Sequence, residues 1–245
     1  MHDDDRPVGR VLTRREILAG IGTAGFAMVL PDVRGPLILA GGAVIPACVV
    51  RPAQTEGPYF VDEKLNRADI RSDPSNGKVS DGALFDLAFR VSRLSGAACA
   101  PLAGAVVDLW QCDAHGVYSD VKDIDGQFNT IGQKFLRGHQ VTGKDGVARF
   151  VTVYPGWYLG RTVHIHFKIR TDPGSQKGSE FTSQVYFDDA FTDSVFAAAP
   201  AYKKGDRTRN ERDGIFRSGG SELILDVTRQ GERYASTFDI GLQLA

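Results

Sequence analysis

Apolar residues alternate with polar ones at a period of two in several stretches of this chain. This pattern constrains the fold most, because alternate side chains of a β-strand point to opposite faces of a sheet. The alternation recurs at 85–91, 107–109, 147–153 and 163–169. Turn-forming residues separate these stretches, at 75–77, 143–146, 172–174 and 218–220. Many short strands with this punctuation predict an all-β fold, an antiparallel β-sandwich.

Composition and charge narrow the class of protein. The 245 residues are 42% apolar and 24% charged, which is typical of a globular domain and not of a disordered chain. The 29 Lys and Arg are balanced by 30 Asp and Glu without a basic block, which argues against a nucleic-acid-binding protein. No linker or repeat interrupts the chain after residue 45, so 46–245 is predicted to be one domain.

The first 45 residues have the pattern of an export signal. Arg14 and Arg15 precede an apolar stretch, 17–30, that is shorter than the about 20 residues needed to span a bilayer as a helix. A basic segment before a short apolar one is typical of a signal peptide, and the adjacent arginines resemble the twin-arginine type. We therefore expect 1–45 to be a twin-arginine-type signal and leader, with no membrane span, and the protein to be exported to the periplasm or beyond. A general secretory signal and a buried helix are the alternatives.

Three cysteines fit an exported protein, because an oxidising compartment allows disulfides. Cys48 and Cys99 flank the first part of the predicted core, and Cys112 lies in a predicted strand. A disulfide between Cys48 and Cys99 would contribute about 4 kcal/mol by constraining the unfolded chain. Three buried thiols that never meet are the alternative, and the sequence leaves both open.

Two of the five histidines form a pair in a predicted strand. His164 and His166 are two residues apart, so they project to the same face while their apolar neighbours point to the core. Two imidazoles side by side are typical of metal ligands; the alternative is a solvated polar face. His115 and His139 are expected at the surface.

The residues around the histidine pair limit the kind of metal site. A cupin-type site would place Glu four residues after His166, where this chain has Arg170, and the HExxH pattern of zinc proteases is absent. The nearest oxygen donors are Tyr154 and Tyr158. Phenolates are hard, anionic ligands that suit ferric iron, and a bound cation allows a tyrosine to bind in its deprotonated form.

Six short segments carry a resemblance to a known family. They are 54–60, 107–114, 116–118, 155–158, 161–167 and 183–187. Together they make the chain similar, over about residues 48–240, to the intradiol ring-cleavage dioxygenases, the non-haem ferric enzymes that include protocatechuate, catechol and hydroxyquinol dioxygenases. The resemblance implies long loops around a metal site on a sandwich with a prealbumin-like core, and residues 101–110 and 145–150 are similar to a strand pair of prealbumin-like modules.

The resemblance also assigns the metal site residue by residue. The ligands of a non-haem Fe(III) ion would be Tyr118, Tyr158, His164 and His166. Tyr118 and His164 would be equatorial, the other two axial, and a hydroxide would fill the fifth place. Tyr154 competes with Tyr158, but the axial tyrosine of the family follows a Pro-Gly pair by two residues, as Tyr158 does.

The same resemblance implies the reaction: intradiol (ortho) cleavage of a catechol-type aromatic, with both atoms of O2 incorporated into a muconate-type diacid, in aromatic compound catabolism or detoxification. Arg161 would stabilise negative charge on the ring, Gln184 would orient that charge or the substrate, and Tyr158 would accept a substrate proton. Trp110 and Trp157 are candidate pocket walls, with 56–60 beside them. The catechol-type substrate and O2 are the expected partners, and a homo-oligomer is compatible with the sequence.

Two departures from the family pattern set the chain apart. Only five residues separate Tyr158 from His164, fewer than in the protocatechuate and catechol enzymes, which leaves the shape of the pocket open. The N-terminal helical dimerisation region of the catechol enzymes is missing, so the chain is more similar to an exported, single-domain branch.

Two alternatives to this function are a non-catalytic prealbumin-like binding module and a ferrous oxygenase that adds a carboxylate to the histidine pair. The charged stretches at 203–204 and 207–212 are expected to be a solvated loop face or a partly cationic rim.

Overall fold

The computed structural model describes residues 48–95, 98–173 and 178–244. The predicted signal and leader, 1–45, lies outside these residues. The described elements are β1 (Leu84–Ser95), β2 (Ala98–Pro101), β3 (Val106–Trp110), β4 (Arg137–Val141), β5 (Val147–Val153), β6 (His164–Arg170), β7 (Glu180–Tyr186), α2 (Asp189–Ala198), β8 (Thr228–Gln230) and β9 (Arg233–Leu242), with short 3₁₀ helices at Asn210–Arg212 and Gly220–Leu223. Within these ranges no helix is long and apolar enough to cross a membrane.

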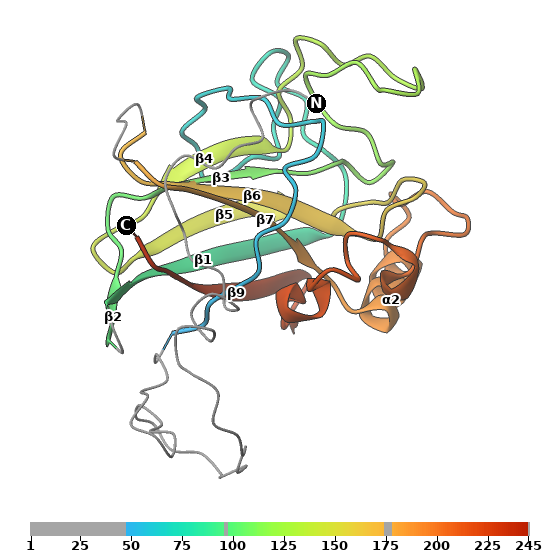
Figure 1. The fold of residues 1–245 in the computed structure, drawn as a ribbon. Helices are drawn as coiled ribbons and strands as arrows, with labels where there is room; N and C mark the ends of the chain where they lie inside the picture. The colour runs from blue at the N-terminus through green and yellow to red at the C-terminus, as the bar shows by residue number, and fades with distance from the viewer. Residues whose placement is uncertain (1–47, 96–97, 174–177, 245) are drawn as a thin grey trace, which may run out of the picture.

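The strands form two sheets that pack as a sandwich (Figure 1). The larger sheet has the order β2-β1-β9-β8, with β5 also paired to β1, and the smaller has the order β4-β3-β6-β7. The strand pairs of the described residues are antiparallel, except that β1 and β9 run parallel. The predicted all-β sandwich is confirmed, with one parallel pair that the alternation does not indicate.

The core lies between the sheets and is rich in aromatic rings. The inward residues of β1 are Phe85, Leu87, Phe89 and Val91, all at most 1% exposed, as their alternation predicts. Phe167 of β6 meets them from the opposite sheet, with its ring centroid 5.0 Å from that of Phe89. In β5 the aromatic ring that points into the core is Phe150. Val147 and Val151, which the alternation places together on one face, are half-buried on the opposite side of the strand.

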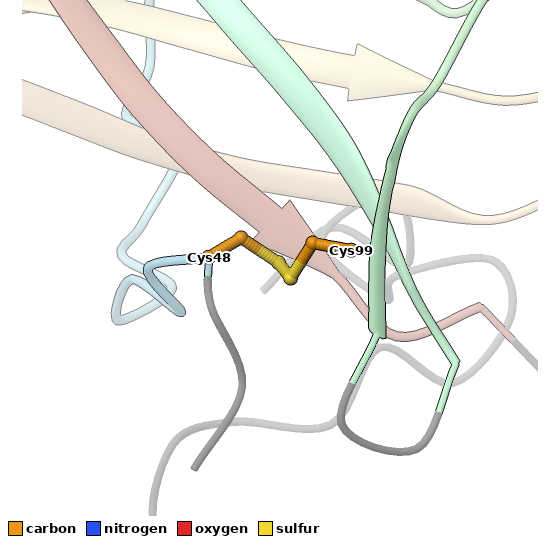
Figure 2. The surroundings of a disulfide bond; sticks show 2 residues. All are labelled: Cys48 and Cys99. Atoms are coloured by element: carbon orange, nitrogen blue, oxygen red, sulfur yellow. A yellow bond between two sulfur atoms is a disulfide. The ribbon is translucent and has the colours of Figure 1, made fainter. Parts of the chain in front are cut away.

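A disulfide joins Cys48 to Cys99 of β2 (Figure 2). The structure thereby selects the pairing that the sequence leaves open. Cys112 is buried just beyond the end of β3 and not within a strand, which corrects its predicted place.

Beyond the disulfide, a strap, defined here as residues 51–62, leaves the larger sheet and crosses the outer face of the smaller one (Figure 1). The backbone N–H of Gln54 donates to the carbonyl of Thr182, at 3.0 Å. The hydroxyl of Ser183 donates to the carbonyl of Pro52, at 2.8 Å. These bonds to β7 place the strap directly over the face of β6 that carries the histidine pair.

Helix α2 lies at one end of the sandwich (Figure 1). The carboxylate of Asp188 caps it by accepting a hydrogen bond from the N–H of Phe191, at 2.8 Å, which satisfies a donor that the first turn leaves free. The chain then returns along the 3₁₀ helix Asn210–Arg212 to the start of β6. This return segment brings polar groups next to the metal-ligand candidates.

Candidate metal centre and active site

Strand β6 carries His164 and His166 on its outer face, yet each is only 2% exposed. The ring of His166 stacks on Trp110 of β3, with centroids 5.0 Å apart and planes 9° from parallel. Gly57 of the strap covers the other side: a Cβ there would lie 3.2 Å from Cε1 of His166, and its φ of +75° is one that glycine adopts without strain. The solvated polar face is therefore excluded, because the pair is buried.

Two loops bring the tyrosines to this face, and glycines allow the loops to touch. A Cβ on Gly116, before Tyr118, would lie 2.2 Å from the carbonyl oxygen of Trp157. A Cβ on Gly156, before Tyr158, would lie 2.4 Å from the carbonyl oxygen of Asp113. Larger residues at either glycine would push the two tyrosine loops apart.

The four predicted ligands converge on one point. The Nε2 atom of His164 lies 3.0 Å from Nε2 of His166, 3.2 Å from the phenol oxygen of Tyr158 and 3.4 Å from that of Tyr118. Tyr154 does not belong to this cluster, because it lies in the core and its hydroxyl bonds the hydroxyl of Thr192, at 2.8 Å. The structure thus separates the two tyrosines between which sequence reasoning had to choose.

A hydrogen bond from His164 turns the lone pair of its Nε2 toward Nε2 of His166. Nδ1 of His164 donates to the carbonyl of Thr162, at 2.6 Å, which fixes the tautomer whose Nε2 lone pair points into the cluster. Nδ1 of His166 has no partner among the described residues. The two Nε2 atoms are 3.0 Å apart, a contact that is favourable only if a cation or a proton lies between them. The donor set of two imidazoles and two phenols therefore fits a metal ion.

Burial governs the protonation of all four groups. It lowers the pKa of His164 to about 3 and that of His166 well below its usual value, so both imidazoles are neutral and able to ligate. It raises the pKa of Tyr118 and of Tyr158 well above the usual value, because a phenolate loses its hydration there. A multivalent cation would supply the charge that deprotonates them. Elsewhere in the described ranges, no three His, Cys, Asp or Glu side chains gather as a metal site.

Arg161 lies beside the ligand cluster. Its Nη1 is 3.5 Å from Nε2 of His164, its Nη2 donates to Oε1 of Gln184 at 2.5 Å, and its Nε donates to Asp213 at 2.9 Å. The amide of Gln184 is fully buried, and its Nε2 donates to the carbonyl of Thr55, at 2.9 Å. Gln184 thus holds the arginine, and its predicted help in orienting the charge or the substrate stays a prediction.

The surrounding residues follow the sequence expectations only in part. Trp110, a candidate pocket wall, is 2% exposed and stacks on the ring of His166, and the ring of Trp157, the other candidate, is covered by the ammonium of Lys203, 4.2 Å from its centroid. His115 is exposed, and His139 is half-buried. Arg207 is only 9% exposed, so the prediction of a solvated loop face is wrong there.

Sequence reasoning missed two contributions to the site. Asp213 carries no motif, and its contact with Arg161 joins segments 52 positions apart. The ring of Tyr59 packs against that of Tyr118 at a tilt, with centroids 4.9 Å apart, and the hydroxyl of Tyr59 donates to Asp123 at 2.6 Å. Its place in the segment 54–60 is the only signal in the sequence, and that segment says nothing of the ring it covers.

Comparisons with known proteins identify the family of the chain. The family model Dioxygenase_C, described as "Dioxygenase", matches residues 55–215. The chain is 32% identical over 106 residues to a chlorocatechol 1,2-dioxygenase of Pseudomonas putida, covering 36% of each protein. It is 28% identical over 156 residues to catechol 1,2-dioxygenase 1 of Acinetobacter lwoffii, covering 53% of this chain and 45% of that protein. The chain thus matches about a third to just under half of the length of these curated relatives.

Solved structures show the same likeness over most of the chain. An intradiol ring-cleavage dioxygenase from Tetranychus urticae superposes with a TM-score of 0.67 at 27% identity, covering 80% of this chain and 95% of that one. The dioxygenase domain of a carbohydrate-binding fusion protein from Streptomyces sp. SirexAA-E superposes with a TM-score of 0.57 at 28% identity, covering 80% of this chain and all of that one. The family match extends over residues 55–62 of the strap, both tyrosine loops and the histidine pair, and the chain belongs to the intradiol ring-cleavage dioxygenase family.

Proposed function

We propose that the protein is a non-haem Fe(III) dioxygenase that cleaves a catechol-type aromatic with O2, between the two hydroxylated carbons, to a muconate-type diacid. One observation carries this proposal: Nε2 of His164 lies 3.0–3.4 Å from Nε2 of His166 and from the phenol oxygens of Tyr118 and Tyr158, in a buried cluster. Two relatives, a chlorocatechol and a catechol 1,2-dioxygenase, support a catechol-type substrate.

Ferric iron, when bound, would act as a Lewis acid that binds the catecholate oxygens and prepares the ring for attack on O2. The protein residues do the rest. Tyr118 and Tyr158 supply hard anionic donors. Tyr158, which only five residues separate from His164, accepts a proton from the substrate. Arg161 directs Nη1 at the cluster, where it stabilises negative charge that develops on the ring. Trp110 and Gly57 close the site around His166 and exclude water.

We also propose that the protein is exported. The twin arginines before a short apolar stretch support this, and so does the disulfide between Cys48 and Cys99, because such bonds persist in oxidising compartments. A fusion to reporter proteins that work only inside or only outside the cytoplasm tests it, with Arg14 and Arg15 changed to Lys as the matched control. Export that continues unchanged in this variant would contradict the twin-arginine route.

A visible spectrum of the purified chain, reconstituted with ferric iron, tests the proposed activity. We expect a red to burgundy colour from charge transfer between phenolates and iron, a shift of this band on adding catechol, and muconate absorbance in air. Tyr118→Phe should remove most of the colour, and Tyr154→Phe, which alters a buried tyrosine outside the cluster, should keep it. A protein that stays colourless with ferric iron would overturn the dioxygenase and favour a binding module.

A further inference from the structure

Asp213 is a carboxylate only 1% exposed at the end of a short 3₁₀ helix. Its Oδ2 accepts hydrogen bonds from Nε of Arg161 and from the backbone N–H of Thr162, both at 2.9 Å. Its Oδ1 accepts from the backbone N–H groups of Ile215, at 2.7 Å, and Phe216, at 3.3 Å. All four partners are donors. An amide of the same shape cannot satisfy them, because one of its two polar atoms is itself a donor.

The guanidinium of Arg161 is fixed along two edges. Asp213 holds Nε, and Gln184 accepts from Nη2 at 2.5 Å. The remaining nitrogen, Nη1, lies 3.5 Å from Nε2 of His164 and therefore faces the ligand cluster. A long side chain has several accessible rotamers. The Asp213 contact therefore decides, together with Gln184, whether Nη1 keeps this direction.

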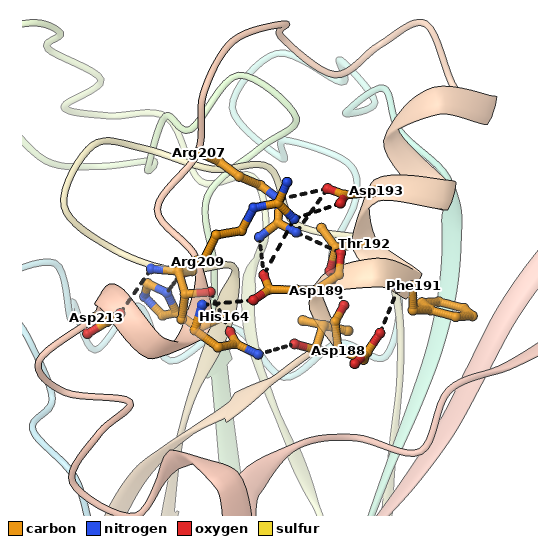
Figure 3. Close-up of polar contacts among 12 residues, drawn as sticks. His164, Asp188, Asp189, Phe191, Thr192, Asp193, Arg207, Arg209 and Asp213 are labelled. Atoms are coloured by element: carbon orange, nitrogen blue, oxygen red, sulfur yellow. Dashed lines mark hydrogen bonds and ion pairs between the residues drawn. The ribbon is translucent and has the colours of Figure 1, made fainter.

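The segment that carries Asp213 is itself anchored to α2 (Figure 3). Arg207 pairs with Asp189, at 2.5 Å, and with Asp193, at 3.0 Å. The backbone N–H of Asn210 donates to Asp189 at 3.0 Å. These contacts tie the brace, defined here as residues 207–213, to the first turns of the helix. Asp213 therefore acts from a segment that α2 holds at its start and in its middle.

We propose that Asp213 is a positioning residue, which aims Nη1 of Arg161 at the charge that develops on the substrate. This inference rests on the proposed function, because it assigns the arginine the stabilisation of negative charge in ring cleavage. Asp213 acts through the arginine and does not touch the substrate. Its loss should therefore slow the chemical step more than it weakens substrate binding.

The test compares steady-state turnover of catechol by the full, iron-loaded chain and by Asp213→Asn. We expect kcat to fall by about 10- to 100-fold, the range for a misaligned charge-stabilising group, while KM changes by less than about 3-fold. Bound iron and the phenolate charge-transfer band should stay as in the wild type. Asp86→Asn is the matched control: it breaks another Arg–Asp pair, with Arg233, away from the cluster, and should leave kcat unchanged.

A double-mutant cycle separates positioning from a merely structural role. Arg161→Ala should itself lower kcat by about 100-fold or more. On that background, Asp213→Asn should add less than about 3-fold, because it has no guanidinium left to aim. In the iron-free protein the losses of Tm should likewise be non-additive. If Asp213→Asn does not fold, Asp213→Glu keeps the charge, displaces the guanidinium by a methylene group and should still lower kcat.

The outcomes are distinguishable. A wild-type protein without turnover fails the proposed function, and the inference falls with it. Normal turnover in the wild type with unchanged kcat in Asp213→Asn and Asp213→Glu overturns the inference alone. So does an equal loss with and without Arg161, or a loss of iron in Asp213→Asn, since either would mean that Asp213 supports the fold or the ligands instead of the arginine.

Discussion

The two faces of β6 show two ways of stabilising a buried surface. The inner face presents Ile165, Phe167 and Ile169, all fully buried against rings and aliphatic chains of both sheets. The outer face, one residue out of step, presents the histidine pair, then Lys168 and Arg170, and it is almost as well covered. The difference lies in what covers them. Apolar side chains cover the inner face, whereas particular charged residues pair with Lys168 and Arg170 on the outer face.

The two charged side chains of the outer face pair with residues from different parts of the chain. Lys168 pairs with Glu180 of β7, at 2.8 Å, and with Glu56 of the strap, and its ammonium lies 4.1 Å from the ring centroid of Phe60. Arg170 binds Asp108 of β3, at 2.8 Å. The strap therefore covers this face at a low energetic cost only if these charges are matched, because a buried charge without a partner is costly.

The largest effect on stability should come from the inner face. Phe167→Ala should lower the free energy of unfolding by about 3–5 kcal/mol, because it leaves a cavity beside Phe89 and Phe238. Phe167→Leu should lower it by much less, since it keeps most of the volume. Urea unfolding of the iron-free protein measures both. Equal losses in the two variants would mean that volume does not govern this face.

A smaller loss of stability, caused by removing a charge and not by leaving a cavity, is expected at Lys168. Lys168→Met keeps the length and apolar volume of the side chain but removes the cation that Glu56 and Glu180 share. We expect a loss of about 2 kcal/mol in the free energy of unfolding, the scale of a buried hydrogen bond to a charged group. Lys168→Arg, which keeps the charge, should lose less.

A gain of stability in Lys168→Met would contradict the comparison. It would mean that the outer face, too, prefers apolar packing to ion pairs, as some buried salt bridges do.

This contrast explains how much the sequence could predict. The alternation around His164 and His166 predicts the strand and the pair, because strand periodicity is local. Tyr158 is one of two tyrosines near the histidine pair in the sequence, and only the resemblance chooses it over Tyr154 and adds Tyr118, because nothing local says that two glycine-bearing loops meet. Asp213 could not be predicted, because its contact depends on the register of distant segments. Inner-face residues are interchangeable apolar types, whereas each outer-face contact needs one particular partner.

The smallest expected effect lies at the edge of the outer face, where Asp62 of the strap binds Arg170 at 3.0 Å. Burial tends to raise the pKa of Asp62, but the hydrogen bond and charge of Arg170 outweigh it, and the pKa is lowered from 3.8. A carboxylate with a lowered pKa in the folded state stabilises the protein above pH 3.8, and this stabilisation is lost as the pH falls through the lower, folded-state value.

Asp62→Asn should therefore lower the free energy of unfolding by about 0.5 kcal/mol at neutral pH, because Asp62 is 34% exposed and its pair is screened by solvent. The difference from the wild type should shrink below pH 3.8 and in about 1 M salt. The loss in Phe167→Ala should depend on neither, since it contains no charge. If the two losses respond alike to acid and salt, the contrast between the faces does not extend to the edge of the sheet, and the strap is held there by packing alone.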